Sequence, residues 1–303
     1  MAIDLASIKN ELFPGLAAVE GRYKKIETKW SRCFEKRNSK MALERRTQMA
    51  YLPLAKEKGE GASTYFDERA GERWMYSAEM RELSLGYIIT RKAVEDNQYR
   101  SEFNPSNLGL QDVFAVTKEI YAANIFNVGN VYDQSVGGDF KALFATDHPI
   151  DVGSIGNKPT TEVDLNESTL LTAMTTIRNN WVDERNIKIT ARAELLVVPA
   201  ALESVAVRLL RTELRPGTND NDVNAIKHVG GGLRDYMVNE FLTSNFAWFI
   251  KTDKRGLIYY DRVPFEMDMY VDFDTDNLKV KGRERYTFSY FDWRAVYGTY
   301  PTS

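Results

Sequence analysis

Between residues 107 and 127, apolar side chains recur at three- and four-residue spacing, which predicts a long α-helix. They cover more than one narrow stripe, so we expect this helix to be buried on two sides. Its apolar residues are Leu110, Val113, Phe114, Val116, Ile120, Tyr121, Ala123 and Phe126. The same spacing predicts shorter helices from Asn166 to about Asp183 and from Ala200 to Arg211, with Asn166 as a residue type favoured at helix starts.

Continuous or alternating apolar runs predict β-strands in the C-terminal part of the chain. The run 193–199, apolar apart from Glu194, is typical of a strand buried on both faces. Aromatic and β-branched segments separated by turns predict further strands at 247–250, 257–263, 267–273 and 285–290. Helices and strands do not alternate regularly, and no repeat recurs at a fixed period. The predicted fold class is therefore α+β.

A long hairpin is predicted between about residues 47 and 89. Short apolar patches flank a charged, turn-prone centre from Lys56 to Ala62. A two-stranded hairpin is at best marginally stable alone in water. This one nevertheless carries many large apolar residues: Tyr51, Leu52, Leu54, Tyr65, Phe66, Trp74, Met75 and Tyr76. We expect a surface outside the hairpin to cover them.

Residues 1 to 45 have the pattern of an amphipathic, basic arm with short helical pieces. Between residues 20 and 46 the sequence holds ten basic and four acidic residues, while residues 266 to 276 carry an acidic run. Phosphate contacts require only positive charge, so the arm could touch nucleic acid without reading its sequence. A solvated basic face explains the same pattern, and the sequence leaves both interpretations open.

The composition indicates a folded protein without a dedicated nucleic-acid or membrane function. Of 303 residues, 43% are hydrophobic and 27% charged, and the length suggests about two structural units. The formal net charge of −3 gives no whole-molecule basic signature.

No apolar run is long enough to span a membrane, and charged residues near the N-terminus argue against a signal peptide. With one cysteine and two histidines, neither an intrachain disulfide nor a Cys/His zinc cluster is expected, and a reducing cytoplasm suits the chain.

The sequence offers only weak candidates for catalysis, and no cofactor or metal is expected. Neither a phosphate-binding loop, nor a dinucleotide fingerprint, nor a nucleophile elbow occurs. The glycines at 230–232 are better explained as a flexible link. Asp147 and His148 could form half of a general-base dyad, although a turn before Pro149 is favoured because a third partner is missing. Cys33 could be a thiolate, but its apolar neighbours favour packing. The acidic run lacks the spacing of a calcium loop and favours a solvated strand face or a subunit contact.

Several blocks of the chain resemble the major capsid proteins of tailed bacteriophages, in the group that includes the Mu-like major head subunits. The blocks occur in the expected order over nearly the whole chain, which is more specific than any single block. They are residues 85–99, 143–149 (Leu-Phe-Ala-Thr-Asp-His-Pro), 195–202 (Leu-Leu-Val-Val-Pro-Ala-Ala-Leu), 219–226, 247–253 (Ala-Trp-Phe-Ile-Lys-Thr-Asp) and 285–298.

The resemblance implies an HK97-like phage capsid fold of four parts. The implied division is an N-terminal arm at 1–45, an extended E-loop at 46–90, a P-domain with a long spine helix at 91–147 and 271–303, and an A-domain at 148–270. The spine helix corresponds to Asn107–Asn127. This division agrees with the pattern of an unsupported hairpin followed by a long helix.

The implied function is a major capsid protein that self-assembles into the icosahedral shell around the double-stranded DNA of a tailed phage. The expected partners are other copies in hexamers and pentamers, a portal, a separate scaffolding protein, a decoration protein and non-specifically bound DNA, with no membrane. The expected location is the virion after synthesis in the host cytoplasm. No enzymatic activity is expected.

Two sets of residues carry this hypothesis. The inter-subunit contact set of the E-loop is Leu52, Leu54, Lys56, Lys58, Tyr65, Phe66, Trp74 and Tyr76. The basic-arm set is Arg22, Lys24, Lys25, Lys29 and Arg32. The alternatives are a phage tail or decoration protein and, less favoured, a soluble hydrolase that uses Asp147 and His148. Some relatives cross-link an E-loop lysine covalently, but no feature of this sequence marks such a site.

Overall fold

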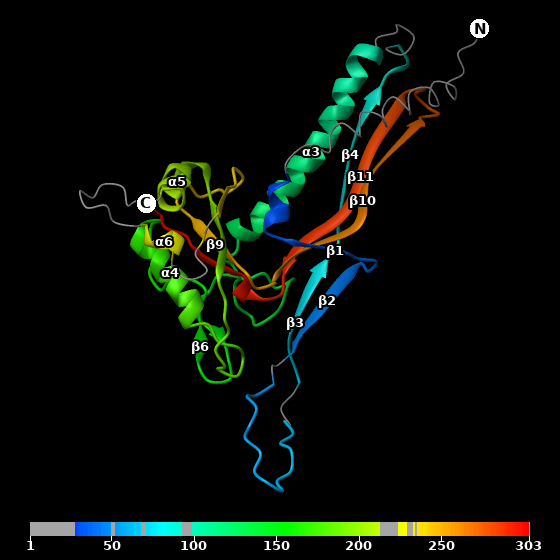
Figure 1. Ribbon diagram of the computed structural model, residues 1–303. Coiled ribbons are helices and arrows are strands. Elements are labelled where there is room, and N and C mark those ends of the chain that lie inside the picture. The colour runs from blue at the N-terminus through cyan, green and yellow to red at the C-terminus, as the bar shows by residue number, and fades with distance from the viewer. Residues whose placement is uncertain are drawn as a thin grey trace.

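The computed structural model describes residues 28–49, 52–67, 71–92, 99–212, 224–228, 233 and 235–302. Figure 1 shows an elongated part, in which a long helix lies beside a narrow twisted sheet, and a more compact lobe of short helices and strands. A long hairpin projects away from both. The chain is α+β, as its pattern predicts.

The elongated part is built on a four-stranded sheet with the order β1-β10-β11-β4. Its strands are β1 (Glu35–Asn38), β10 (Leu257–Val271), β11 (Leu278–Tyr290) and β4 (Arg81–Ile89). β1 runs parallel to β10, and the other neighbours are antiparallel. Helix α3 (Tyr99–Asn127) lies along this sheet (Figure 1).

One long strand replaces two predicted ones in this sheet. β10 runs continuously through the region where strands at 257–263 and 267–273 were expected. Its pairing with β11 shifts register on both sides of Val263, next to Pro264. Proline has no N–H to donate to a neighbouring strand, so a β-bulge rather than a strand end accommodates it.

The lobe is built on a second four-stranded sheet with the order β12-β9-β7-β8. Its strands are β12 (Val296–Thr299), β9 (Trp248–Thr252), β7 (Ala193–Val198) and β8 (Asp235–Val238). Every residue of β7 except Glu194 is buried, which confirms the expectation from its continuous apolar run.

Short helices cover the lobe sheet. They are α4 (Glu167–Asn179), η2 (Ala200–Leu202), α5 (Glu203–Leu210) and α6 (Ala225–His228), and two further 3-10 turns, η1 (Lys29–Arg32) and η3 (Trp293–Ala295), flank the sheets. Asn166 caps α4, because its side chain accepts a hydrogen bond from the Thr169 amide. The helix ends at Asn179 rather than near Asp183, since the Asp183 side chain instead accepts the amides of a tight turn.

The predicted hairpin is present. β2 (Leu43–Met49) pairs antiparallel with β3 (Glu72–Glu79) to form its stem, and residues 52–67 form the hairpin loop beyond the stem. A second, two-residue pairing joins β5 (His148–Pro149) and β6 (Ser154–Ile155) in the lobe. We use "hairpin" below for β2, β3 and the hairpin loop.

The main core joins the lobe to the end of α3. Its largest fully buried side chains include Trp181, Trp248, Phe126, Phe249 and Leu196. The Phe126 ring, from α3, lies 5.2 Å from the Phe249 ring of the lobe sheet. The end of the long helix is therefore packed into the lobe.

Helix α3 differs from its prediction in two ways. It begins at Tyr99 rather than at residue 107, and Pro105 does not end it. One face is buried, with Leu110, Phe114 and Phe126 in the core, but Val113, Val116 and Ile120 are exposed. The prediction that α3 is buried on two sides is therefore wrong for the single chain.

The sheet pairings do not follow the boundary expected between residues 270 and 271. That boundary would separate β10 from β11, which are hydrogen-bonded along nearly their whole length. β12, expected in the P-domain, pairs with β9 in the lobe sheet. In sheet terms, residues 257–290 belong to the elongated part and 296–299 to the lobe.

Candidate functional site

The hairpin loop exposes four large apolar side chains. The exposed fractions are 68% for Leu52, 70% for Leu54, 54% for Tyr65 and 80% for Phe66. Residues 52–67 form no strand, and within them one backbone hydrogen bond joins the amide of Ala62 to the carbonyl of Gly59. Covering such side chains with another surface removes them from water and lowers the free energy. The loop is therefore a candidate contact surface.

The two loop lysines of the predicted contact set are also exposed. The Lys56 ammonium lies 3.8 Å from the centre of the Tyr65 ring, a cation–π contact across the loop. Lys58 lies near the turn at Glu60 and Gly61. These residues give the loop a charged tip beside its apolar sides.

Two members of the predicted contact set need correction, because their own chain covers them. Tyr76 is buried, and its ring lies 6.2 Å from the Tyr290 ring. Burial raises the pKa of the Tyr76 hydroxyl above its ordinary value. Trp74 is half-buried, with its ring 5.9 Å from the Phe140 ring. Tyr76 is therefore not available to another molecule, whereas Trp74 offers only part of its surface.

Glycines in the segment facing the stem explain why Tyr76 can be buried there. Gly138 has a φ of +91°, and a Cβ at this position would overlap the Tyr76 ring. Its amide donates to the carbonyl of Met75 at 3.0 Å, and the amide of Ser77 donates to the carbonyl of Val136 at 2.7 Å. The base of the stem therefore continues the pairing of its own chain with residues 136–138.

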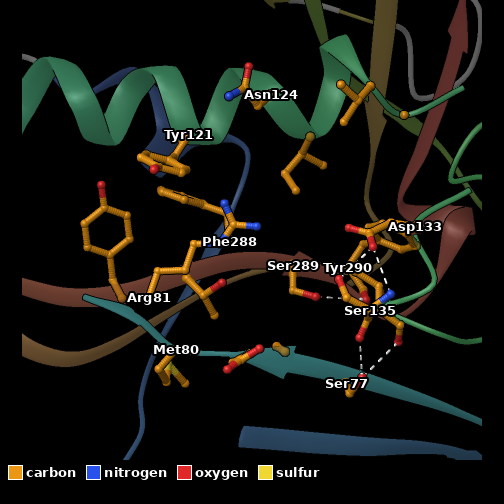
Figure 2. Close-up of a pocket in the computed structure, with 18 of the residues that line it drawn as sticks. Ser77, Met80, Arg81, Tyr121, Asn124, Asp133, Ser135, Phe288, Ser289 and Tyr290 are labelled. Carbon is orange, nitrogen blue, oxygen red and sulfur yellow. Dashed lines mark hydrogen bonds between the residues drawn. The ribbon is translucent and has the colours of Figure 1, made fainter. Parts of the chain in front are cut away.

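A cavity of about 670 Å³ lies beside this base. α3, β11 and the junction of β3 with β4 line it, and Figure 2 shows Arg81, Tyr121 and Asn124 around it. Ser77 donates to the carbonyl of Ser135 at 2.6 Å at one end. The space leaves the junction between stem and sheet without close packing from α3.

The basic arm lies mostly outside the described residues, as do Arg22, Lys24 and Lys25. Lys29 forms an ion pair with Glu240 at 2.5 Å, and Arg32 forms one with Asp235. These two cations are thus already paired with carboxylates of the lobe. They hold the start of the described chain against the lobe.

The Asp147–His148 dyad considered from the sequence does not exist. Asp147 is exposed and paired with Lys141, whereas His148 is buried with its Nδ1 at 2.6 Å from Oδ2 of Asp139. The His148 ring stacks on Trp293, with centres 4.5 Å apart and planes 4° apart. Asp147 directly precedes β5, and successive residues of an extended chain point to opposite sides, which separates the two side chains.

The remaining chemical candidates have structural surroundings. Cys33 is buried, and burial raises the pKa of its thiol to about 12, which favours the packing interpretation. In the acidic run, Asp272 is paired with Lys279 at 2.9 Å and Asp276 with Arg91 at 2.6 Å. Across the described ranges, no group of three or more His, Cys, Asp and Glu side chains could hold a metal ion. The glycines at 230–232 lie outside those ranges.

A family model described as phage capsid protein matches residues 82–299, which is more than half of the chain. The chain belongs to the phage capsid protein family. A search of the curated proteins found no match.

Solved structures show that this capsid protein has the HK97-like fold. A chain from the capsid of cyanophage P-SCSP1u is similar, with a TM-score of 0.58, 9% identity and coverage of 91% of this chain and 89% of that one. A chain from the procapsid of bacteriophage JBD30 has a TM-score of 0.54, 12% identity and coverage of 99% and 77%. A chain of a virus-like particle from Pyrococcus furiosus has a TM-score of 0.52, 8% identity and coverage of 94% and 95%.

The protein is thus a major capsid protein, a subunit of a phage shell, and its place is the virion. This assignment agrees with the exposed apolar surface of the hairpin loop. Where the structure describes helices, none is long and apolar enough to cross a membrane.

Proposed function

We propose that the hairpin loop of this capsid protein lies across a neighbouring subunit and joins the subunits of the shell. The observation that carries the proposal is the exposure of Leu52, Leu54, Tyr65 and Phe66 on a segment that projects beyond the rest of the chain (Figure 1). A neighbouring copy supplies the surface that the protomer lacks.

The free energy of such a contact is modest for one subunit and large for a shell. Complete burial of a Leu or Phe side chain stabilises by about 1.5 to 3 kcal/mol. Association and loop ordering offset much of this gain. In a closed symmetric assembly each subunit both gives and receives the same contact, so weak contacts are repeated around the whole particle.

The wider assembly follows from the same proposal. Lobes pack around local axes in hexamers and pentamers to form an icosahedral shell that encloses double-stranded DNA. A portal, a separate scaffolding protein and a decoration protein complete the particle. The role is structural rather than catalytic, which is consistent with the separation of Asp147 from His148 in the fold.

The test replaces exposed apolar side chains of the loop. We expect the double variant Leu54→Ser and Phe66→Ser to fold normally, because both residues are exposed in the single chain. Its yield of closed particles, measured by sedimentation and electron microscopy, is expected to fall at least tenfold, because the covered apolar area is lost.

The matched control is the double variant Glu57→Gln and Glu60→Gln, which alters exposed polar residues of the same loop. Particle yield from this control is expected to equal that of the unaltered protein. Normal particle yield from the serine variant would contradict the proposal.

A further inference from the structure

A buried carboxylate, Glu184, lies between the lobe and the stem of the hairpin. It is 2% exposed and sits in the turn that follows α4. Arg294 of η3, itself 3% exposed, donates two hydrogen bonds to it, from Nη1 to Oε1 at 2.9 Å and from Nη2 to Oε2 at 3.0 Å. This bidentate pair fixes the carboxylate within the lobe.

Both strands of the stem reach the same carboxylate. Gln48 of β2 donates from its side-chain amide to Oε1 of Glu184. Nη1 of Arg73, from β3, lies 3.5 Å from Oε2 of Glu184. Nη2 of the same side chain forms an ion pair with Asp151. One lobe residue therefore holds both strands at the same level of the stem.

The next residue extends this contact toward the loop. Arg185 forms an ion pair with Asp67 at 2.6 Å, at the point where the hairpin loop returns to the stem. The turn that carries Glu184 and Arg185 is itself fixed, because Asp183 accepts the amides of Arg185 at 2.8 Å and Ile187 at 2.7 Å. A constrained turn of the lobe thus presents one anion and one cation to the hairpin.

The contacts at the base of the hairpin restrain its outer part less than the contacts with Glu184 and Arg185 do. There, β3 pairs with residues 136–138, and the cavity of about 670 Å³ lies between its junction with β4 and α3. A two-stranded ribbon is at best marginally stable by itself, so its outer part needs contacts of its own. The contacts with Glu184 and Arg185 lie further from the base, so they resist rotation of the ribbon with a longer lever arm.

We infer that Glu184 and Arg185 are positioning residues that set the direction in which the hairpin projects from its own lobe. The inference rests on the proposed contact between the loop and a neighbouring subunit. If the loop binds a neighbour, its angle to the lobe sets the angle between the two subunits. Loosening these contacts therefore changes the curvature of the assembly rather than its ability to form contacts.

The test removes the contacts from the hairpin side, which leaves the buried pair of Glu184 and Arg294 intact. In the double variant Gln48→Ala and Arg73→Gln, we expect hydrogen exchange of the β2 and β3 amides in the unassembled subunit to rise at least tenfold. The midpoint of thermal unfolding is expected to stay close to that of the unaltered protein. Electron microscopy is expected to show open or wrongly sized particles in place of at least half of the closed ones.

The matched control is Arg45→Gln, since Arg45 lies exposed on the other face of β2. We expect unchanged exchange and unchanged particles from it. If the double variant does not fold, Arg185→Gln decides the question, because it breaks only the outer ion pair. Unchanged exchange and particle size in the folded variant would overturn the inference.

The serine variant of the loop separates this inference from the proposed function. Loss of assembly in the serine variant, combined with normal particles from the Gln48 and Arg73 variant, would reject the positioning role alone. Normal assembly of the serine variant would reject the loop contact and, with it, the basis of the positioning role.

Discussion

Buried polar side chains in this protein hold loops in place. Asn157 is fully buried, and its amide nitrogen lies 2.8 to 3.1 Å from the carbonyl oxygens of Leu143, Trp293 and Val296, which share its two N–H groups. Its oxygen accepts the amide of Ala145 at 3.0 Å. These bonds give backbone groups of several loops a hydrogen-bond partner in the interior. The same logic places His148 between Asp139, Asn157 and Trp293 as a structural residue.

Cys33 provides a residue-level prediction that depends on pH. Its pKa is raised to about 12 by burial, so the thiol remains protonated at pH 8.5, where an exposed cysteine is about half ionised. We expect Ellman's reagent to label the folded protein at pH 8.5 at least a hundredfold more slowly than the protein unfolded in guanidinium. Rapid labelling of the folded chain would show that Cys33 is accessible and contradict its buried position.

At the scale of elements, the hairpin joins two segments with different surroundings. Its stem is packed on its own chain through Tyr76 and Trp74, whereas the hairpin loop exposes Leu54 and Phe66. The stem therefore contributes to the fold of the subunit. The loop contributes apolar surface that the subunit itself does not use.

This division predicts the result of shortening the loop. We expect deletion of Lys56–Ala62 to change the free energy of unfolding by less than about 1 kcal/mol, because exposed loop residues contribute little to stability. Assembly into particles is expected to be impaired, because the sides of the loop lose their geometry. Circular dichroism with thermal unfolding measures the first effect and electron microscopy the second. Shell yield equal to that of the full-length chain would reject the role of the loop.

At the scale of the whole molecule, the charge distribution is uneven. Lys29 and Arg32 at the start of the described chain are paired with Glu240 and Asp235 of the lobe. Further basic residues, Arg22, Lys24 and Lys25, precede them outside the described residues. We propose that this part of the arm faces the packaged DNA or lies under a neighbouring subunit.

Charge reversal tests the role of the arm. The double variant Lys24→Glu and Lys25→Glu is expected to lower the titre of filled particles at least tenfold, because it removes phosphate or subunit contacts that depend on positive charge. Lys188→Glu, at an exposed position of the lobe, is the control for a single charge reversal, which is half the change made by the double variant. An unchanged titre of filled particles from the double variant would count against the proposed role.

Local patterns predicted much of the secondary structure because each depends on nearby residues alone. The buried strand at 193–198, the helix that starts after Asn166 and the hairpin around Lys56–Ala62 all follow from spacing, capping and turn chemistry. The start of α3 did not follow, since the presence of Pro105 favoured a later helix start. The division between the two sheets did not follow either, because it depends on which distant strands pair.

The candidate site was predictable in the loop but not in the stem. The exposed apolar residues of the loop lie on a hairpin that no neighbouring segment of the sequence can cover. Their exposure could therefore be predicted from the sequence. The burial of Tyr76 requires Gly138, a residue distant in sequence, to leave room for its ring. Glu184 had no local signal, since its partners Gln48, Arg73 and Arg294 come from three distant parts of the chain.

The sequence by itself determined the α+β class, the hairpin, the long helix and the family, because periodicity, turn residues and ordered blocks of similarity are written along the chain. Only the tertiary structure decided which apolar residues stay exposed, which ionisable groups meet, and where the hairpin is held. Burial and ion pairing depend on distances between residues far apart in sequence, and those distances exist only once the chain has folded.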